Sequence, residues 1–223
     1  MDNNNILEKS YLEVNLSSIA NNIERIKRCV GKDVIVAPVI KANAYGLGTA
    51  GLKTVLDEEN IKIVIVATIE EAVRLRSEGY TQEIITLNEL LPYETKNILK
   101  YNLLPGVSDF DVVCALNEEA KKYNKLANIH VEVDTGMGRV GKKPSEMLEF
   151  CKAIRKLSNI NIEGIYTHFS SADSDQEYTK MQVNQFNNVL DVLEAEGFTF
   201  KYIHTSASSG ILNVESGRPK GQQ

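Results

Sequence analysis

The sequence is poor in cysteine. Three cysteines occur in 223 residues, at the widely spaced positions Cys29, Cys114 and Cys151. They are odd in number, and each lies in a segment with helical patterning rather than in a short ligand motif. The pattern favours neither a disulfide framework nor a zinc site, so we expect no bound metal.

Long apolar runs and a surplus of basic charge are also missing. No apolar stretch approaches the roughly 20 residues that span a bilayer, and the first ten residues have neither the basic start nor the apolar core of a targeting segment. The formal net charge is −5, whereas nucleic acids and anionic membranes attract a concentrated basic face. We therefore expect a cytoplasmic protein with no nucleic-acid and no membrane partner.

The chain does contain apolar strands that alternate with helical segments. Seven segments have strand character: 34–40, 63–67, 84–87, 103–107, 129–133, 162–167 and 202–205. Helical patterns separate them, among them 109–123, 145–157 and 178–196. Such alternation predicts an α/β protein built from parallel βαβ units, either an open doubly wound sheet or a TIM (β/α)8-type barrel.

The barrel is favoured because the residues with chemical potential follow different strands, whereas in an open sheet they would gather at one switch point. A closed barrel needs eight strands, and seven are found. We expect an N-terminal extension with a short strand at 11–16 within residues 1–16, a barrel over 17–212, and a polar tail at 213–223. Ser17 and Gly31 are expected to bound the first helix, and Thr68 with Glu71 to form a capping box.

Residues 34–48, VIVAPVIKANAYGLG, carry the strongest chemical signal. The apolar start predicts a buried parallel strand with Lys41 at its C-terminal tip, where partial desolvation favours a free amine that attacks carbonyls. Tyr45 adds a hydroxyl, and Gly46 and Gly48 would let backbone N–H groups approach an anion. An amine beside an anion cradle suits pyridoxal phosphate (PLP). The structural alternative is a lysine that only snorkels from a buried strand.

Residues 134–141, DTGMGRVG, predict a glycine-rich loop that contains Met137 and Arg139. A guanidinium in such a loop can donate to a phenolate or a carboxylate. Glu132 has the strand parity of Asp134 and so faces the barrel interior or its rim. A carboxylate inside a strand needs a partner, and we expect Arg139 to be that partner, either at a site or as a structural bridge.

Two histidines follow later strands. His168 stands at a strand tip, where a lone histidine is more often structural than a base. His204 opens the stretch HTSASSG, which runs to Gly210 and includes Ser208. Its hydroxyls and small residues before a helix are typical of a phosphate seat after the seventh strand of a barrel. A catalytic Ser/His pair is disfavoured, because no carboxylate is placed to orient His204.

The stretches VIKANAYGLG, HVEVDTGMGRVG, GIYTHFSSAD and IHTSASSG occur in the order, and at about the spacing, of the N-terminal barrel of alanine racemases. The chain resembles that family from Tyr11 to about Asn213. The resemblance implies a PLP-dependent isomerase of fold type III that interconverts L-alanine and D-alanine for peptidoglycan synthesis. It also implies a homodimer that acts on a small-molecule substrate, alanine, with serine as a second candidate.

The resemblance also implies residue roles. Lys41 resembles the catalytic lysine that binds PLP as a Schiff base and then serves as one of two bases. Tyr45 and Ser208 are similar to phosphate ligands, and Arg139 is similar to the donor to the phenolic oxygen. His168 and His204 resemble cofactor-binding residues around the ring, with Glu132 and Met137 in supporting positions.

Several positions depart from the family pattern. Glu132 stands where many members have a carbamylated lysine, and Ala207 stands where asparagine is common. Arg218-Pro219 resembles the family's RPG strand, but Lys220 replaces its glycine. The tyrosine that a partner's β domain contributes as second base has no counterpart. We therefore expect a barrel without the eighth strand and without the C-terminal β domain.

Four hypotheses remain open at this level. The motifs favour a truncated alanine racemase, whereas length favours a single-domain PLP-binding or PLP-homeostasis protein without racemase activity. A Schiff-base lyase or aldolase that uses Lys41 without PLP, and an inactive remnant, are the other two. Covalent attachment of PLP to Lys41 would settle much of this choice.

Overall fold

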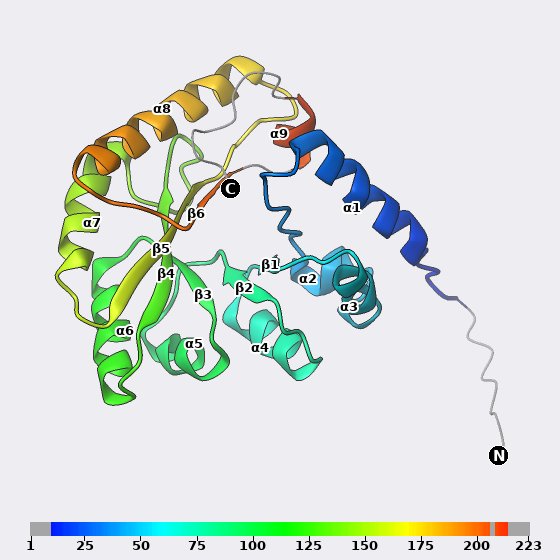
Figure 1. Cartoon of the computed structure of the whole chain (residues 1–223), viewed down its shortest axis with the longest axis horizontal. Helices are drawn as coiled ribbons and strands as arrows, with labels where there is room; N and C mark the ends of the chain where they lie inside the picture. The colour runs from blue at the N-terminus through cyan, green and yellow to red at the C-terminus, as the bar shows by residue number, and fades with distance from the viewer. Residues whose placement is uncertain (1–9, 206–207, 214–223) are drawn as a thin grey trace.

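The computed structural model describes residues 10–205 and 208–213. Within these residues, six strands form one parallel sheet whose spatial order, β1-β2-β3-β4-β5-β6, is the order of the chain. The strands are β1 (Ile63–Val66), β2 (Glu83–Thr86), β3 (Leu104–Val107), β4 (Ala127–Val133), β5 (Ile160–Thr167) and β6 (Tyr202–His204). The sheet curves, and helices line its outer side (Figure 1). The predicted α/β fold of barrel type is confirmed.

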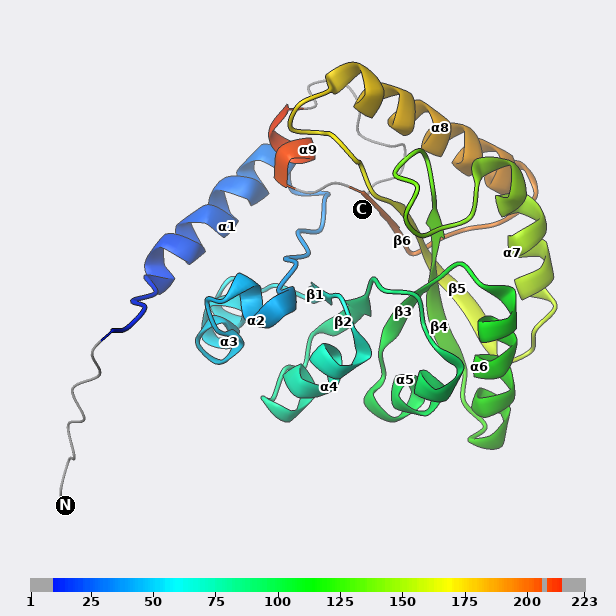
Figure 2. The same ribbon diagram turned by 180° about the vertical axis from the view of Figure 1, so that it is seen from behind.

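Helices connect the consecutive strands. They are α4 (Ile69–Ser77), α5 (Thr95–Tyr101), α6 (Phe110–Lys122), α7 (Met147–Arg155) and α8 (Gln176–Ala195), with the short 3-10 turns η1 (Pro92–Glu94) and η2 (Pro144–Glu146). Before β1 the chain forms α1 (Leu16–Val30), α2 (Lys41–Tyr45) and α3 (Thr49–Glu58), and α9 (Ser208–Asn213) follows β6. Seen from behind, α1 and α9 lie next to each other (Figure 2).

The two faces of the sheet bury different side chains, because successive residues of a strand point to opposite faces. Val64, Ile84 and Ile129 face the helices and belong to the main core. The alternate positions form a second cluster on the inner face, made of Ile63, Ile65, Ile85, Leu104 and Tyr202. In the β4 to β6 half of the sheet the same inner face carries polar and aromatic side chains, which build the candidate site.

One salt-bridge network joins distant strands at their N-terminal ends. Lys201, just before β6, lies 3.1 Å from Glu83 of β2 and 3.1 Å from Glu163 of β5. The pKa of Lys201 is raised, first by a hydrogen bond with the Tyr202 hydroxyl and then by these two carboxylates. The lysine is half exposed, so the network defines geometry more than it adds stability.

The predicted buried strand at 34–40 is wrong. A single bridge, Val39 to Ile65, joins this segment to β1, and Val39 and Ile35 are 37% and 43% exposed. Pro38 has no N–H to donate. Within residues 10–205 and 208–213, no strand pairs with the edge of the segment that faces away from β1. Because β6 pairs with β5 alone among those residues, the described sheet is an open barrel of six strands and one bridge.

The ends of the described chain also differ from expectation. Residues 11–15 form no strand, and α1 is capped by Asn15 rather than Ser17, since the Asn15 side chain accepts from the Ser18 N–H at 3.0 Å. Gly31 ends α1 as predicted, with φ of 91°. The capping box of Thr68 and Glu71 is confirmed. Most of the predicted tail, residues 214–223, lies outside the described residues. None of the described helices combines the length and apolarity that a membrane span requires.

Candidate functional site

The predicted site residues converge at one rim of the open barrel. Parallel strands end on the same side, so Lys41 beyond the β1-paired segment, Arg139 after β4, His168 after β5 and His204 at the end of β6 share that rim. His168 is half-buried. Burial, and then the positive charges of Arg139 and Lys41, lower the pKa of His168. His168 is therefore within electrostatic reach of both cations.

Lys41 is half-buried and opens α2, a turn with an unusual backbone. Residues 42–45 all have left-handed φ values, between 50° and 56°. For residues with a Cβ this conformation costs about 1–2 kcal/mol each relative to the right-handed one. The turn brings Tyr45 close to Lys41, with the lysine Nζ 5.9 Å from the centre of the tyrosine ring. Tyr45 is 65% exposed, so its hydroxyl is accessible at the rim.

Gly46 and Gly48 do not have the role that the sequence suggested. The Gly46 N–H donates to the carbonyls of Ala42 and Asn43, and the Gly48 N–H donates to the carbonyl of Asn43 at 2.9 Å. Both donors are used to close the turn rather than left for an anion. The glycines are needed for their positive φ values of 88° and 89°.

Arg139 lies in a loop that folds around Asp134. One carboxylate oxygen of Asp134 accepts from the Gly136 N–H at 3.0 Å and from the Gly138 N–H at 2.9 Å. A Cβ on Gly141 would lie 2.8 Å from the Asp134 nitrogen, so the loop closes only with glycine there. Arg139 is exposed and Met137 half-buried, which leaves the guanidinium available to a ligand.

The expected Glu132–Arg139 ion pair is absent from the ion pairs that the described residues form. Glu132 of β4 instead accepts a hydrogen bond from the Tyr166 hydroxyl at 2.8 Å. The reason is register: Tyr166 lies directly opposite Glu132 on β5, whereas Arg139 lies in the exposed loop. Burial raises the pKa of Glu132 to about 6, although the Tyr166 hydrogen bond and the Arg139 charge act in the opposite direction.

His204 is part of a buried aromatic layer that includes a residue missed by sequence reasoning. Its Nε2 is 2.8 Å from Nδ1 of His130 on β4, and Tyr166 stacks on its ring at 4.7 Å. Burial lowers the pKa of His204 to about 4, so the imidazole is neutral near pH 7. His130 is fully buried. The sequence did carry a signal for His130: it lies two residues before Glu132, so both side chains point to the same face of the strand.

Two glycines make room for this layer. A Cβ on Gly164 would lie 2.5 Å from two atoms of the His130 ring, and a Cβ on Gly106 would collide with the Tyr166 hydroxyl. Gly164 pairs with His130 in the β4–β5 register. Glycine is therefore required at both positions, because the His130 and Tyr166 rings occupy the space that a side chain would need.

Helix α8 fixes two of the rim loops. Its fully buried Gln182 donates to the Thr135 hydroxyl at 3.2 Å and to the His168 carbonyl at 3.3 Å, and accepts from the Ser170 N–H at 3.1 Å. Tyr178, one turn earlier, donates its hydroxyl to the Gly136 carbonyl at 2.8 Å. The Arg139 loop and the His168 loop are thus held to one helix.

Ser208 is the first residue of α9 and is exposed. Ser206 and Ala207, which complete the predicted seat between His204 and Ser208, lie outside the described residues. The rim therefore offers an amine, a guanidinium and two accessible hydroxyls, at Lys41, Arg139, Tyr45 and Ser208. This donor set fits PLP, whose aldehyde, phenolic oxygen and phosphate need such partners.

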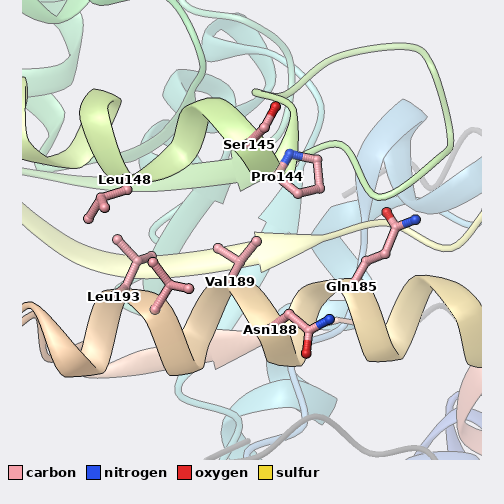
Figure 3. Close-up of a pocket in the computed structure, with 8 residues that line it drawn as sticks. Pro144, Ser145, Leu148, Gln185, Asn188, Val189 and Leu193 are labelled. Carbon is pink, nitrogen blue, oxygen red and sulfur yellow. The ribbon is translucent and has the colours of Figure 1, made fainter.

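A cleft on the outer side of the barrel lies apart from these groups. It is formed between η2, α7 and α8, and apolar side chains such as Leu148, Val189 and Leu193 face it (Figure 3). Lys41, Arg139 and His168 are not among the residues that line it. The candidate site is therefore placed at the rim, where these polar groups lie, and not in this cleft.

Comparisons with known proteins agree with this geometry. The family model described as alanine racemase, N-terminal domain, matches residues 14–219. An alanine racemase of Halothermothrix orenii is 38% identical over 96% of this chain and 56% of its own length, and one of Carboxydothermus hydrogenoformans is 37% identical over 92% and 55%. The solved alanine racemase of Clostridium difficile 630 superposes with a TM-score of 0.90 at 31% identity, over 94% of this chain and 56% of that one. The chain thus spans about half the length of the relatives it matches.

Proposed function

Because the chain belongs to the family of alanine racemase N-terminal domains, we propose that it is the PLP-binding barrel of an amino-acid racemase. The substrate is alanine, interconverted between its L and D forms for peptidoglycan synthesis, with serine as a second candidate. The observation that carries the proposal is the convergence of Lys41, Arg139 and His168 at one rim, where burial, and then the charges of Arg139 and Lys41, lower the pKa of His168.

Each rim residue has a role in this proposal. The Lys41 amine binds the cofactor covalently, and the hydroxyls of Tyr45 and Ser208 bind its phosphate. Arg139 donates to its phenolic oxygen. His168 and His204 border its ring, His204 being fixed by His130 at 2.8 Å. Glu132 and Met137 support these groups from β4 and the loop that follows it.

PLP, when bound, supplies an electron sink that makes the α-proton of an amino acid removable. Lys41 Nζ then takes and returns that proton on one face of the substrate. Inversion needs a second acid/base on the opposite face. Tyr166 is unsuited to that role, because its hydroxyl is bound to Glu132 and burial, with the Glu132 charge, raises its pKa well above 10.

The proposal extends to the surroundings of the protein. It includes a cytoplasmic location and no membrane or nucleic-acid partner, in keeping with the net charge of −5, because such partners attract a concentrated basic face. Family membership supports a homodimer. A partner subunit would also be the natural source of the second acid/base.

The test is covalent labelling of the 223-residue chain. PLP is added, borohydride fixes it, and peptide mapping locates the label. We expect the label on Lys41 and none in Lys41→Ala, with Lys53→Ala, a lysine of the α3 surface, as the control that stays labelled. A label on Lys53 or Lys142 would contradict the assignment and with it the proposed cofactor site.

The second candidate is a PLP-binding protein without racemase activity, which is favoured because the Tyr166 hydroxyl is bound to Glu132 and cannot act as the second acid/base. Proton exchange separates this candidate from a racemase. With L-alanine in D₂O, a chain that has one proton-transferring face gives deuterium incorporation with little D-alanine. Loss of one general acid/base costs about 10²–10⁴-fold in rate, and we expect this deficit for the isolated chain. Rapid D-alanine formation would instead assign the second base to this barrel, with His168 as the residue to replace.

A further inference from the structure

The left-handed turn at residues 42–45 cannot hold its own geometry. Its internal hydrogen bonds run from the Ala44 N–H to the Ile40 carbonyl at 2.9 Å and from the Gly46 N–H to the Ala42 carbonyl at 3.1 Å. A right-handed turn makes equivalent bonds and is preferred by alanine and tyrosine. The choice of hand must therefore come from contacts outside the turn.

The first outside contact is a carboxylate of α4. One oxygen of Glu71 accepts from the Ala42 N–H at 2.6 Å. The other accepts from the Ala67 N–H at 2.8 Å and from the Thr68 N–H at 3.3 Å. Three backbone donors thus meet at one side chain, which ties the residue after Lys41 to the residue after β1.

The second outside contact lies one helical turn further along α4. Arg74 donates from Nη2 to Oδ1 of Asn43 at 3.0 Å and from Nε to Glu78 at 2.8 Å. Thr49 completes a closed cycle of hydrogen bonds with these residues, since its hydroxyl donates to Glu78 at 2.6 Å and its N–H donates to Asn43 Oδ1 at 3.1 Å. Glu71, Arg74 and the C-cap Glu78 are spaced by three and four residues, so they lie on one face of α4, and this face holds the turn through hydrogen bonds.

We propose that Glu71 is a positioning residue for Lys41: by binding the Ala42 N–H it selects the left-handed turn and keeps the Lys41 amine near the Tyr45 side chain at the rim. Arg74 supports the same turn through Asn43. The inference rests on the proposed function, because it assumes that an aldehyde with a phosphate binds at this pair. A relaxed turn changes the position of the amine relative to the Tyr45 side chain and weakens that binding.

The primary test compares Glu71→Gln with Glu70→Gln, an exposed neighbour in the first turn of α4. A glutamine presents an NH₂ group to one of the three donors, so at least one hydrogen bond to a charged acceptor is lost. The measurement is the PLP concentration that gives half-maximal borohydride-fixed label on Lys41. We expect a rise of about tenfold for Glu71→Gln and no change for Glu70→Gln. Equal values for both variants would overturn the proposal.

A rescue experiment separates positioning from helix capping, the other role of Glu71. Glycine takes positive φ without penalty, so Ala42→Gly in the Glu71→Gln background should recover about fivefold of the loss. The same change in the wild-type background should have no effect, because the turn is already formed. Ala50→Gly, an exposed position in α3, is the control that should not rescue. Failure of Ala42→Gly to rescue would reduce Glu71 to a helix cap and overturn the proposal.

A substitute variant and the labelling of the wild-type chain keep the proposal testable in every case. If Glu71→Gln does not fold, Arg74→Gln takes its place, with the same rescue and the same criteria, because Arg74 is outside the capping box. Absence of label on Lys41 in the wild-type chain would overturn the proposed function together with this inference. Labelled wild-type protein with unchanged variants would overturn the inference alone.

Discussion

Glu132 and His130 place two titratable side chains on the buried face of one strand. Neither is paired with an opposite charge at contact distance in the described residues. Glu132 is bound by a phenol and His130 by a second imidazole. Both partners come from neighbouring strands in register, so the polar layer is satisfied largely by hydrogen bonds between neutral groups and one carboxylate.

Replacing Glu132 by glutamine tests this arrangement. The side chain keeps an acceptor for the Tyr166 hydroxyl and loses a buried charge whose pKa is raised to about 6 from 4.5. We expect the free energy of unfolding at pH 8 to increase by up to about 2 kcal/mol, and the gain to shrink near pH 5, where Glu132 is protonated. Urea denaturation measures it, with the surface variant Glu118→Gln as control. Destabilisation at pH 8 would favour the Glu132–Arg139 ion pair instead.

Gly164→Ala probes the room that the aromatic layer needs. The new methyl group would meet the His130 ring, which cannot move because it is fully buried, so we expect a loss of about 1–3 kcal/mol. Thermal and urea unfolding give the value. Gly51→Ala is the matched control, since its Cβ would lie 3.8 Å from Leu16 in ordinary contact and alanine favours the α3 helix. Equal stability of the two variants would contradict the packing argument.

At the scale of elements, the sequence predicted the six strands and the main helices between them. Apolar periodicity located β2 to β5, which have a strand on each side, and also the edge strands β1 and β6, whose apolar residues are covered by the rest of the barrel. It failed at residues 34–40, where apolar composition suggested burial but the pairing partner on one side is not in the described chain. The left-handed turn after Lys41 was also out of reach, because its hand depends on Glu71, which lies 30 residues further along the sequence.

Helix α8 carries a prediction of its own. Gln182→Ala removes the bridge between the loops after β4 and β5 and leaves the His168 carbonyl and the Ser170 N–H without this partner. We expect a cost of roughly 1–3 kcal/mol and faster amide hydrogen exchange at residues 135–138 and 168–171. Asn184→Ala, exposed on the same helix, should leave both quantities unchanged. Unaltered exchange in Gln182→Ala would show that the loops hold their positions independently of α8.

For the whole molecule, the histidines determine how stability varies between pH 7 and pH 4. The pKa of His204 falls from 6.5 to about 4 on folding, and those of His130 and His168 fall as well. On acidification below pH 6.5 the unfolded chain binds these protons first, so the free energy of unfolding decreases. The raised pKa of Glu132 acts in the opposite direction between pH 6 and 4.5, but one group opposes three.

We therefore expect the cofactor-free chain to lose stability steadily from pH 6.5 to pH 4. For His204 alone the difference between 6.5 and about 4 corresponds to about 3 kcal/mol. Urea midpoints at pH 7, 6 and 5 measure the trend. His204→Gln, which can still bind His130, should flatten it. A midpoint that is constant or rises on acidification would contradict the assignment of neutral, buried imidazoles.

The strand order β1-β2-β3-β4-β5-β6 has a consequence for biosynthesis. Each strand pairs with the one that left the ribosome just before it, so the growing sheet never waits for a partner that is still to be translated. The bond from Lys201 to Glu83 spans 118 residues and forms late, when the nascent chain has emerged past β6. Vectorial translation and sheet growth thus run in the same direction, and the lysine marks the completion of the described sheet.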